Sequence, residues 1–364
     1  MAPSSRDIPS EMLAVQVIKY NAPLAIQKVP TPSVSKLGSY DMLLRTAVAS
    51  LCHTDLMVLA GVFASPLPIT MSHEGTGVVV AKGDAVTDFQ LGDRVMSGIS
   101  LHPCGKCENC NPPAGQDWNQ YCFATDGATG IKSDGAFAEY HVVDSRASCH
   151  VPDEVSFMAA APLACAGVTV YRAVLVSGVR SGGWLAIVGA GGGLGHFGIQ
   201  FAKASGINVI AIDARDEGLE VARRAGAEHV LDACEGKDQI VEKVQALTDG
   251  RGVEATINVS DHPSTAALSV AITRMHGVVV QAAQPEEITV PFQDVVLRDV
   301  AIKGTMYGDR DTSQEMLNVV ARNGIKAETE VFDGLGEVPK MIELLESGRL
   351  KGKAVCVVDR SLVD

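Results

Sequence analysis

The sequence lacks an excess of positive charge. Its 30 lysines and arginines are outnumbered by 43 aspartates and glutamates, which gives a formal net charge of −13. The basic residues are scattered, and no run of them suggests a groove for a phosphate backbone. This composition argues against nucleic acid or an anionic membrane as a main partner.

The sequence also has no uninterrupted apolar stretch long enough to span a bilayer, and its start lacks the apolar core of a signal peptide. Clustered thiols without a signal peptide favour metal ligands over a disulfide framework, and this chain has nine cysteines. We therefore expect a cytoplasmic protein, with a loose tail over the first dozen residues.

The length of 364 residues predicts two domains. From Met12 to about Val95, short apolar runs alternate with Gly, Pro and Asp, a pattern typical of an all-β, barrel-like unit. From about residue 160, strand–helix alternation predicts a parallel, doubly wound sheet and hence an α/β fold class. The segment 309–364 is predicted to carry two helices, Gln314–Asn323 and Val338–Glu346, and a terminal strand. We expect it to return to the first domain.

A compact run of cysteines predicts a structural zinc site. Cys104, Cys107 and Cys110 are separated by two-residue gaps, which let consecutive thiolates face one ion, and Cys122 is the expected fourth ligand. The segment 102–122 has too little apolar content to pack by itself, so a metal would have to order it.

A second, dispersed set predicts a catalytic zinc site. Cys52, His73 and Cys165 offer two thiolates and an imidazole, and they leave the fourth position open for water or substrate. Each residue alone would more often belong to a core, so the prediction depends on the combination. We expect three further cysteines to be structural, namely Cys149, Cys234 and Cys356.

A glycine-rich loop follows the strand pattern Trp184–Val188 and opens a helix. Such a loop lets the backbone approach a pyrophosphate, which then rests on the helix N-terminus. Asp213 ends the next strand, where its carboxylate can bond both ribose hydroxyls and would repel a 2′-phosphate. This favours NAD over NADP, although Arg215 partly offsets the effect. The expected loop contacts are Gly189, Gly191, Gly192, Gly193, Leu194 and Gly195.

Taken together, these motifs resemble those of the zinc-dependent medium-chain alcohol dehydrogenases, most closely the fungal, yeast-type branch. The resemblance covers nearly the whole chain. It implies a GroES-like catalytic domain over 1–166 with both zinc sites, a Rossmann NAD-binding domain over 167–308, a return of 309–364 to the catalytic domain, and a homodimer or homotetramer. The matching segments are Cys52–Leu56, His73–Gly75, the four-cysteine run, Leu163–Tyr171, Gly189–Gly195 and Ile257–Ser260.

The resemblance assigns roles in the chemistry. Two Zn²⁺ ions per chain and NAD(H) are implied, with hydride passing between the substrate carbon and the nicotinamide. Thr54 would take the proton from the alcohol, Asp55 would orient His73, and Glu74 would be able to replace water on the metal. The residues implied to bind the cofactor, beyond the loop and Asp213, are His53, Ser260 and Lys353.

Three positions depart from the yeast-type pattern. Met57 stands where those enzymes place a histidine that ends the proton relay, and a thioether cannot titrate. Phe63 and Ile99 stand at the apparent places of tryptophans that narrow the pocket for small alcohols, so we expect a substrate larger than ethanol. The gap before Cys122 is also longer than usual, which puts the shape of that loop in doubt but not its metal.

The leading hypothesis is an NAD(H)-linked alcohol dehydrogenase or aldehyde reductase acting on a small molecule. A polyol or amino-alcohol dehydrogenase of the same superfamily is the alternative among enzymes. A zinc-free enone reductase is disfavoured, because that branch lacks the catalytic thiols. A zinc-stabilised dinucleotide sensor is the non-enzyme alternative, but a sensor has no use for an open zinc site.

Overall fold

The computed structural model describes residues 8–363. Its internal contacts divide the chain into a first unit, made of Met1–Cys165, Gly308–Arg322 and Thr329–Asp364, and a second unit, made of Ala166–Tyr307 and Asn323–Glu328. A loose tail was expected over the first dozen residues. Residues 1–7 of it lie outside the described part of the chain. From Glu11 onward the chain is already in strand β1.

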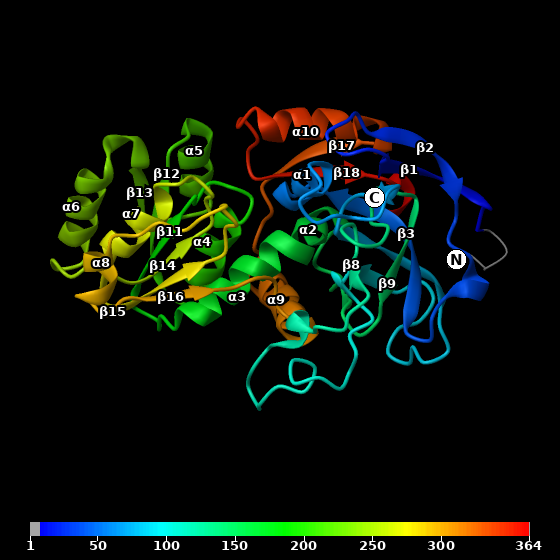
Figure 1. The fold of residues 1–364 in the computed structure, drawn as a ribbon, viewed down its shortest axis with the longest axis horizontal. Helices are drawn as coiled ribbons and strands as arrows, with labels where there is room; N and C mark the ends of the chain where they lie inside the picture. Colours follow the sequence, from blue (N-terminus) through cyan, green and yellow to red (C-terminus); the bar gives the residue numbers. More distant parts are fainter. Residues whose placement is uncertain (1–7, 364) are drawn as a thin grey trace. The chain divides into compact units, whose positions relative to one another are not determined.

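The first unit is built mainly from β-strands (Figure 1). Its largest sheet has the order β10-β6-β5-β3-β18-β17, and β9 also pairs with β3. A three-stranded sheet has the order β2-β1-β4, and β7 pairs with β8. The strands are β1 (Glu11–Val17), β2 (Ala25–Pro30), β3 (Asp41–Ser50), β4 (Ile69–Thr70), β5 (Glu74–Lys82), β6 (Arg94–Met96), β7 (Ser100–Leu101), β8 (Gly127–Ala128), β9 (Tyr140–Asp144), β10 (Cys149–His150), β17 (Thr329–Asp333) and β18 (Lys353–Val357).

Strand β3 lies at the centre of this unit and is buried on both of its faces. Leu43 belongs to one apolar cluster, whereas its neighbours Met42 and Leu44 belong to another, as the two-residue period of a strand requires. The C-terminal strand β18 pairs antiparallel with β3, from Val355 opposite Ser50 to Val357 opposite Val48. This pairing brings Lys353, at the start of β18, close to the strand ends that carry the first metal-ligand set.

Among the described residues, four α-helices lie largely or wholly in the first unit: α1 (His53–Leu59), α2 (Phe157–Pro162), α9 (Arg310–Asn323) and α10 (Val338–Glu346). The sequence predicted the bounds of α10 correctly, whereas α9 begins four residues before the predicted start at Gln314. A helix also runs continuously from α2 (Phe157–Pro162) through a π-helical turn (Leu163–Gly167) to α3 (Val168–Ser177).

That composite helix, 21 residues with a mean hydropathy of 1.6 over its most apolar window, meets the length and composition of a membrane span, which the sequence analysis did not foresee. However, 78% of the window is buried within the protein, which fits a core helix.

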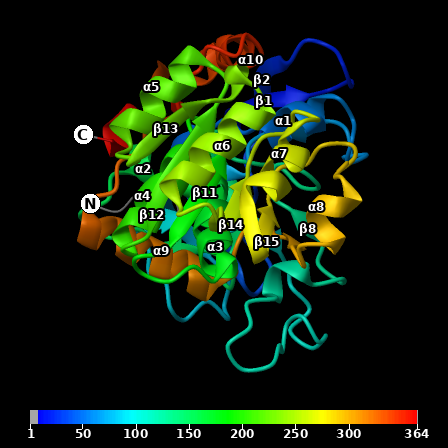
Figure 2. The ribbon, with the colours of Figure 1, turned by 90° about the vertical axis from the view of Figure 1, so that its left-hand side faces the viewer.

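The second unit is a six-stranded, wholly parallel sheet in the order β13-β12-β11-β14-β15-β16 (Figures 1 and 2). This is the strand order of a Rossmann fold, and the predicted doubly wound sheet is confirmed. The strands are β11 (Trp184–Val188), β12 (Asn208–Asp213), β13 (His229–Asp232), β14 (Val253–Asn258), β15 (Thr273–Gln281) and β16 (Ala301–Gly304), and the helices besides α3 are α4 (Gly195–Ala204), α5 (Asp216–Arg224), α6 (Lys237–Leu247), α7 (Thr265–Ile272) and α8 (Phe292–Val296).

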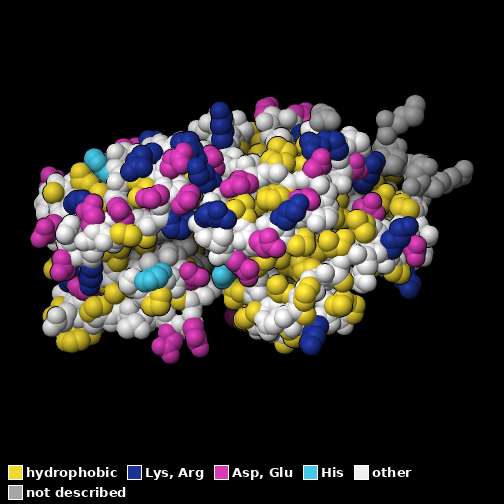
Figure 3. All heavy atoms as spheres, turned by 90° about the horizontal axis from the view of Figure 1, so that it is seen from above, with side chains coloured by type: hydrophobic (Ala, Val, Ile, Leu, Met, Phe, Trp, Pro, Cys, Tyr) yellow, Lys and Arg dark blue, Asp and Glu magenta, His cyan; other side chains and the backbone are white. Residues whose placement is uncertain are grey.

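Helices cover both faces of this sheet. The side chains of β11 alternate between the two faces and contact helices on each. Ala186 and Val188 pack in one cluster with residues of α6 and α7, including Ile240. A Cβ atom at Gly198 of α4 would meet Val170 of α3 and Ile187, which places α3 and α4 on the opposite face. On the surface drawn in Figure 3, acidic and basic side chains are interspersed over the described residues.

Candidate metal centres and cofactor loop

The first unit brings the dispersed ligand set together at one buried point. One ligand atom from each of Cys52, His73, Glu74 and Cys165 lies within 4.8 Å of the others. Cys52 is the N-cap of α1, His73 and Glu74 open strand β5, and Cys165 lies in the π-helical turn. Three distant segments therefore supply the site.

The donor set fits a metal ion. Within the described residues, neither ring nitrogen of His73 has a hydrogen-bond partner, although the side chain is 1% exposed. A buried imidazole without a partner is costly unless something else binds it, and a metal does so. The hydrogen bond with Cys165 holds the pKa of Cys52 well below its usual value, while the same contact and burial raise the pKa of Cys165. Of the two thiols, Cys52 is therefore the one that ionises more readily.

Asp55 positions two of the ligand-bearing segments through hydrogen bonds to their backbone. Its Oδ2 accepts a hydrogen bond from the backbone N–H of Cys52 at 2.8 Å, and its Oδ1 accepts one from Ser72 at 3.0 Å. The same Oδ1 lies 3.7 Å from Nδ1 of His73, too far for a hydrogen bond but close enough for electrostatic attraction. The carboxylate is fully buried and fixes both the helix start and the strand start that carry ligands.

Helix α1 presents the residues expected to meet substrate and cofactor. Thr54 Oγ1 lies 3.8 Å from Cys52 Sγ, so its hydroxyl is beside the ligand cluster. His53 is exposed in the first turn, and Met57 is half-buried one turn later. Phe63 packs against the adjacent apolar core, whereas Ile99 is 4% exposed. The roles expected for these residues toward substrate and cofactor stay predictions.

Lys353 lies at the metal-ligand cluster, which the sequence analysis did not foresee. Its Nζ is 2.6 Å from Oε2 of Glu74, and the two side chains are 5% and 0% exposed. Burial raises the pKa of Glu74 to about 7, against the opposing effect of the Lys353 ammonium. Burial alone would lower the pKa of Lys353, but Glu74 and Cys52 raise it above its ordinary value. Its expected contact with a cofactor pyrophosphate stays a prediction.

The second ligand set lies on a long loop, drawn in cyan in Figure 1, that has little regular structure. The four sulfur atoms of Cys104, Cys107, Cys110 and Cys122 lie within 4.8 Å of one another. Backbone N–H groups of Lys106 and Cys107 lower the pKa of Cys104 to about 6, which favours the ligating thiolate. The long gap before Cys122 is taken up by a single 3₁₀ turn, Asn119–Tyr121.

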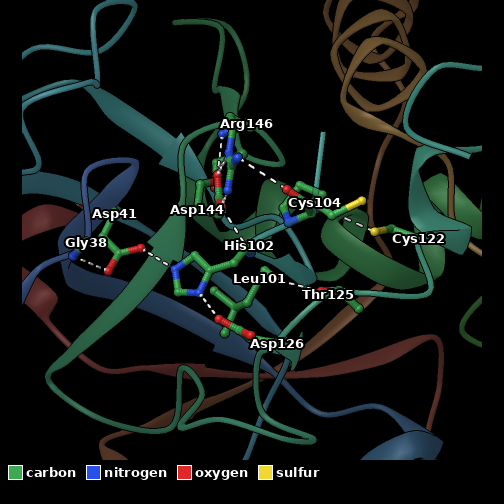
Figure 4. Close-up of polar contacts among 12 residues, drawn as sticks. Gly38, Asp41, Leu101, His102, Cys104, Cys122, Thr125, Asp126, Asp144 and Arg146 are labelled. Carbon is green, nitrogen blue, oxygen red and sulfur yellow. Dashed lines mark hydrogen bonds and ion pairs between the residues drawn. The ribbon is translucent and has the colours of Figure 1, made fainter. Parts of the chain in front are cut away.

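Polar contacts fasten this loop at its base (Figure 4). The ring of His102 lies between two carboxylates, with Nε2 at 2.7 Å from Asp41 and Nδ1 at 2.6 Å from Asp126. Asp144 accepts the backbone N–H of His102 at 3.0 Å and pairs with Arg146. The sequence analysis did not identify this network; the only signal was that His102 and Asp126 flank the four-cysteine run.

The glycine loop of the second unit is packed so closely that side chains would not fit. A Cβ atom at Gly191 would lie 1.9 Å from the carbonyl oxygen of Gly218, and one at Gly195 would lie 2.4 Å from that of Gly189. Among the described residues, the backbone N–H groups of Gly193, Leu194 and Gly195 have no acceptor. Free amides at the start of α4 form an anion site that suits a pyrophosphate.

Asp213 stands at the end of β12, as predicted, but its carboxylate already has partners. Oδ2 accepts the N–H of Gly191 at 2.9 Å, and Oδ1 accepts those of Ala214 and Arg215 at 2.9 and 3.1 Å. Each carboxylate oxygen can accept a second bond, so a ribose hydroxyl still has a place on Oδ2. Arg215 Nε lies 3.4 Å from Oδ1 and partly neutralises the negative charge of Asp213. Ser260 lies beside Gly189 of the glycine loop.

Comparison with known proteins places this arrangement in a family. The alcohol dehydrogenase GroES-like domain matches residues 38–153, and the zinc-binding dehydrogenase domain matches residues 193–322. Alcohol dehydrogenase 1 of Emericella nidulans is 35% identical, with 96% of this chain and 98% of that protein covered. An alcohol dehydrogenase of Geobacillus stearothermophilus is 36% identical, with 96% and 100% covered.

A solved structure described as an NAD-dependent alcohol dehydrogenase superposes with a TM-score of 0.86 at 28% identity, covering 96% of this chain and 100% of its own. The match extends over both units. The chain belongs to the zinc-dependent, medium-chain alcohol dehydrogenases.

Proposed function

We propose that this protein is an NAD(H)-linked alcohol dehydrogenase and aldehyde reductase whose substrate is a primary alcohol or aldehyde larger than ethanol. The observation that carries the proposal is the cluster of Cys52, His73 and Cys165, in which neither imidazole nitrogen has a hydrogen-bond partner among the described residues. Glu74, the fourth donor of the cluster, is paired with Lys353, so three ligands leave a coordination position open. A purely structural metal site would have closed that position.

A zinc ion bound there would polarise the substrate oxygen and lower the pKa of an alcohol. Thr54 carries a hydroxyl 3.8 Å from Cys52 Sγ and is the group proposed to receive the alcohol proton. Asp55 keeps the ligands in register. Lys353 balances the charge of Glu74, so that the cluster does not accumulate negative charge from two thiolates and a carboxylate.

The glycine loop and Asp213 support NAD as the cofactor, as does the NAD-dependent relative described above. The ion pair of Arg215 with Asp213 sets the degree of preference, because a guanidinium beside the ribose site reduces the repulsion of a 2′-phosphate. We propose that NAD is preferred but that NADP is not fully excluded. His53, exposed at the start of α1, is proposed to reach the pyrophosphate.

An exposed sheet edge supports the proposed homo-oligomer. All four residues of β16 are exposed at the edge of the parallel sheet, and an unpaired edge is a template for another strand. Nearby, Phe292, Val296 and Leu297 are 66%, 69% and 67% exposed. Whether the assembly is a dimer or a tetramer is tested by light scattering of the eluting protein, and a monomer would contradict the proposal. A cytoplasmic location remains a prediction.

The experiment that tests the activity is a series of primary alcohols and aldehydes of increasing length, assayed by NADH absorbance with NAD and NADP in parallel. We expect kcat/KM to rise beyond two carbons, because each additional buried methylene contributes about 0.8 kcal/mol. A peak at two carbons would remove the substrate claim. Activity restricted to polyols or amino alcohols would favour the alternative enzyme. One zinc ion per chain together with no turnover would favour the sensor.

A further inference from the structure

An open hollow of about 530 Å³ lies in the second unit and has no part in the chemistry described so far. We name it the amino-edge pocket. It is lined by the loop Ser177–Gly183, which connects α3 to β11, and by Glu254, Arg274, His276 and Val278.

The amino-edge pocket lies at the opposite edge of the sheet from the cofactor loop. Gly183 immediately precedes β11, and Glu254 is the second residue of β14, so both stand where parallel strands begin. The glycine loop follows the carboxyl end of β11, whose five residues span about 16 Å. One ligand of ordinary size cannot occupy both places.

The lining carries cationic groups that are not fully used by the protein. Among residues 8–363, no hydrogen bond or ion pair engages the guanidinium of Arg180, and the backbone N–H groups of Arg180 and Ser181 have no acceptor. Arg274 donates to Oε1 of Glu254 at 2.8 Å, while the other oxygen of Glu254 accepts the N–H of Trp184 at 2.6 Å. Both oxygens of Glu254 are thus engaged, and Arg274 uses one N–H group on Glu254. The other N–H groups of its guanidinium remain available to a ligand.

The backbone at the rim of the pocket is strained at one residue. His276 has a φ of 59°, a left-handed conformation unfavourable for a side-chain-bearing residue, and its Nδ1 lies 2.8 Å from Oδ2 of Asp299. The pairing of β15 with β14 is interrupted here, because Val253 faces Thr273 but Ala255 already faces Val278. The residues between them bulge out of the ladder and place Arg274 and His276 at the rim. Strain of this kind persists where the surrounding structure holds it, and such residues cluster at functional sites.

We propose that the amino-edge pocket binds a small phosphate-bearing anion. Arginine forks and successive free backbone amides match the oxygens of a phosphate group. The two arginines of the lining outnumber its one carboxylate, Glu254, in a chain with a net charge of −13. The pocket size suits a phosphate monoester of a small metabolite. Inorganic phosphate shares its chemistry and serves as the probe.

The test is equilibrium dialysis of radiolabelled phosphate against the full zinc-loaded protein in saturating NAD, so that the cofactor's own phosphate site is filled. We expect one phosphate per chain. Arg180→Gln should weaken binding about tenfold, as expected for loss of a charged hydrogen-bond donor. Arg251→Gln, at an exposed arginine outside the pocket, is the matched control and should bind like the unmodified protein.

A second variant is expected to raise the affinity for phosphate instead of lowering it. Glu254→Gln keeps an oxygen for the N–H of Trp184 but removes the negative charge and releases Arg274, so phosphate should bind more tightly. Turnover should not change in either variant, since neither residue belongs to the metal or cofactor sites. No phosphate bound in the presence of NAD, or equal affinity in all four proteins, would overturn the proposal. A glycerol phosphate competition arm then distinguishes a phosphate ester from free phosphate as the preferred ligand.

Discussion

The two cysteine-rich clusters of the first unit have similar ligand atoms in opposite surroundings. Cys52, His73 and Cys165 come from distant segments and are supported by the buried Asp55. Cys52 and His73 are buried, and Cys165 is partly exposed. The four sulfur atoms of the loop cluster come from one short run of sequence, and Cys104, Cys107 and Cys110 are partly exposed.

This difference separates two uses of the same metal. The buried cluster is assembled by the fold, since strands β3 and β5 are buried along most of their length and Leu163, Ala164 and Ala166 of the π-helical turn are buried as well. The loop cluster depends on its ion, because the loop around it has almost no apolar core of its own. A metal in the first site is expected to serve turnover, and a metal in the second to serve stability.

The largest expected effect is the loss of turnover in Cys52→Ala. Removing one of three ligands weakens metal binding, and several kcal/mol of electrostatic stabilisation of the transition state are lost. The value of kcat/KM should therefore fall about 10³-fold or more. The unfolding temperature should change little, because the core around β3 remains. Cys234→Ala, at an exposed cysteine outside both clusters, is the matched control and should keep its activity. Near-normal turnover of Cys52→Ala would show that the site is wrongly assigned.

Cys107→Ala should reverse that pattern. The loop loses a ligand and much of the folding free energy that the ion supplies, so we expect a loss of about 3 kcal/mol and a fall in melting temperature of roughly 6–12 °C. Turnover of the protein that remains folded at low temperature should be retained within a few-fold. Calorimetry and zinc content check the prediction, with one ion per chain expected in place of two. An unchanged melting temperature would show that the loop does not depend on its metal.

A smaller effect should separate the carboxylates that support the two clusters. Asp55→Asn keeps the size of the side chain but removes the charge that faces His73, so zinc affinity of the buried site should fall about 10–100-fold. Asp126→Asn changes an exposed carboxylate beside the loop and should cost under about 1 kcal/mol of stability without touching that affinity. Competition with a coloured chelator measures both variants. Equal zinc affinities would mean that Asp55 only caps its helix.

Much of this contrast could be predicted from the sequence because some signals are local. The two-residue gaps between Cys104, Cys107 and Cys110 indicate one ion without knowledge of the fold. The strand, glycine loop and Asp213 follow one another within a single strand–helix–strand unit. For the same reason the helix Val338–Glu346 was predicted with its observed bounds.

Other features depend on contacts between distant parts of the chain, and no local pattern announces them. Lys353 reaches Glu74 only because the C-terminal strand β18 joins the sheet beside β3. His102 becomes a bridge because Asp41 and Asp126 converge on its ring from different segments. The π-helical turn that presents Cys165 was also unpredicted, since it interrupts an otherwise regular apolar helix.

The last expected effect depends on pH and concerns two histidines in these two surroundings. His141 is buried in the core of the first unit, between Thr46 at 2.8 Å and Ser97 at 2.7 Å, and burial lowers its pKa to about 4. At the base of the exposed loop, burial opposes protonation of His102, but the hydrogen bonds to Asp41 and Asp126 raise its pKa above the ordinary value. The two rings should therefore affect stability with opposite dependence on pH.

The signs follow from the unfolded-state pKa of about 6.5. Below that pH the unfolded chain protonates His141 and the folded chain does not until about pH 4, so its stabilising effect is lost as the pH falls, by at most about 3 kcal/mol. The charged His102 stabilises the fold fully below about pH 6.5, and that effect is lost as the pH rises through its raised folded pKa. His102 is partly exposed, so solvent screening makes its effect the smaller one.

Melting temperatures measured from pH 5 to pH 9 check both signs by difference from the unmodified protein. His141→Gln should lose less stability than the unmodified protein between pH 7 and pH 5, because glutamine takes up no proton in either state. His102→Gln should be less stable at acidic pH and approach the unmodified protein at alkaline pH. Curves that stay parallel for His141→Gln would mean that this ring is not held neutral in the folded core. Parallel curves for His102→Gln would mean that the base of the loop is held by shape and metal instead of by charge.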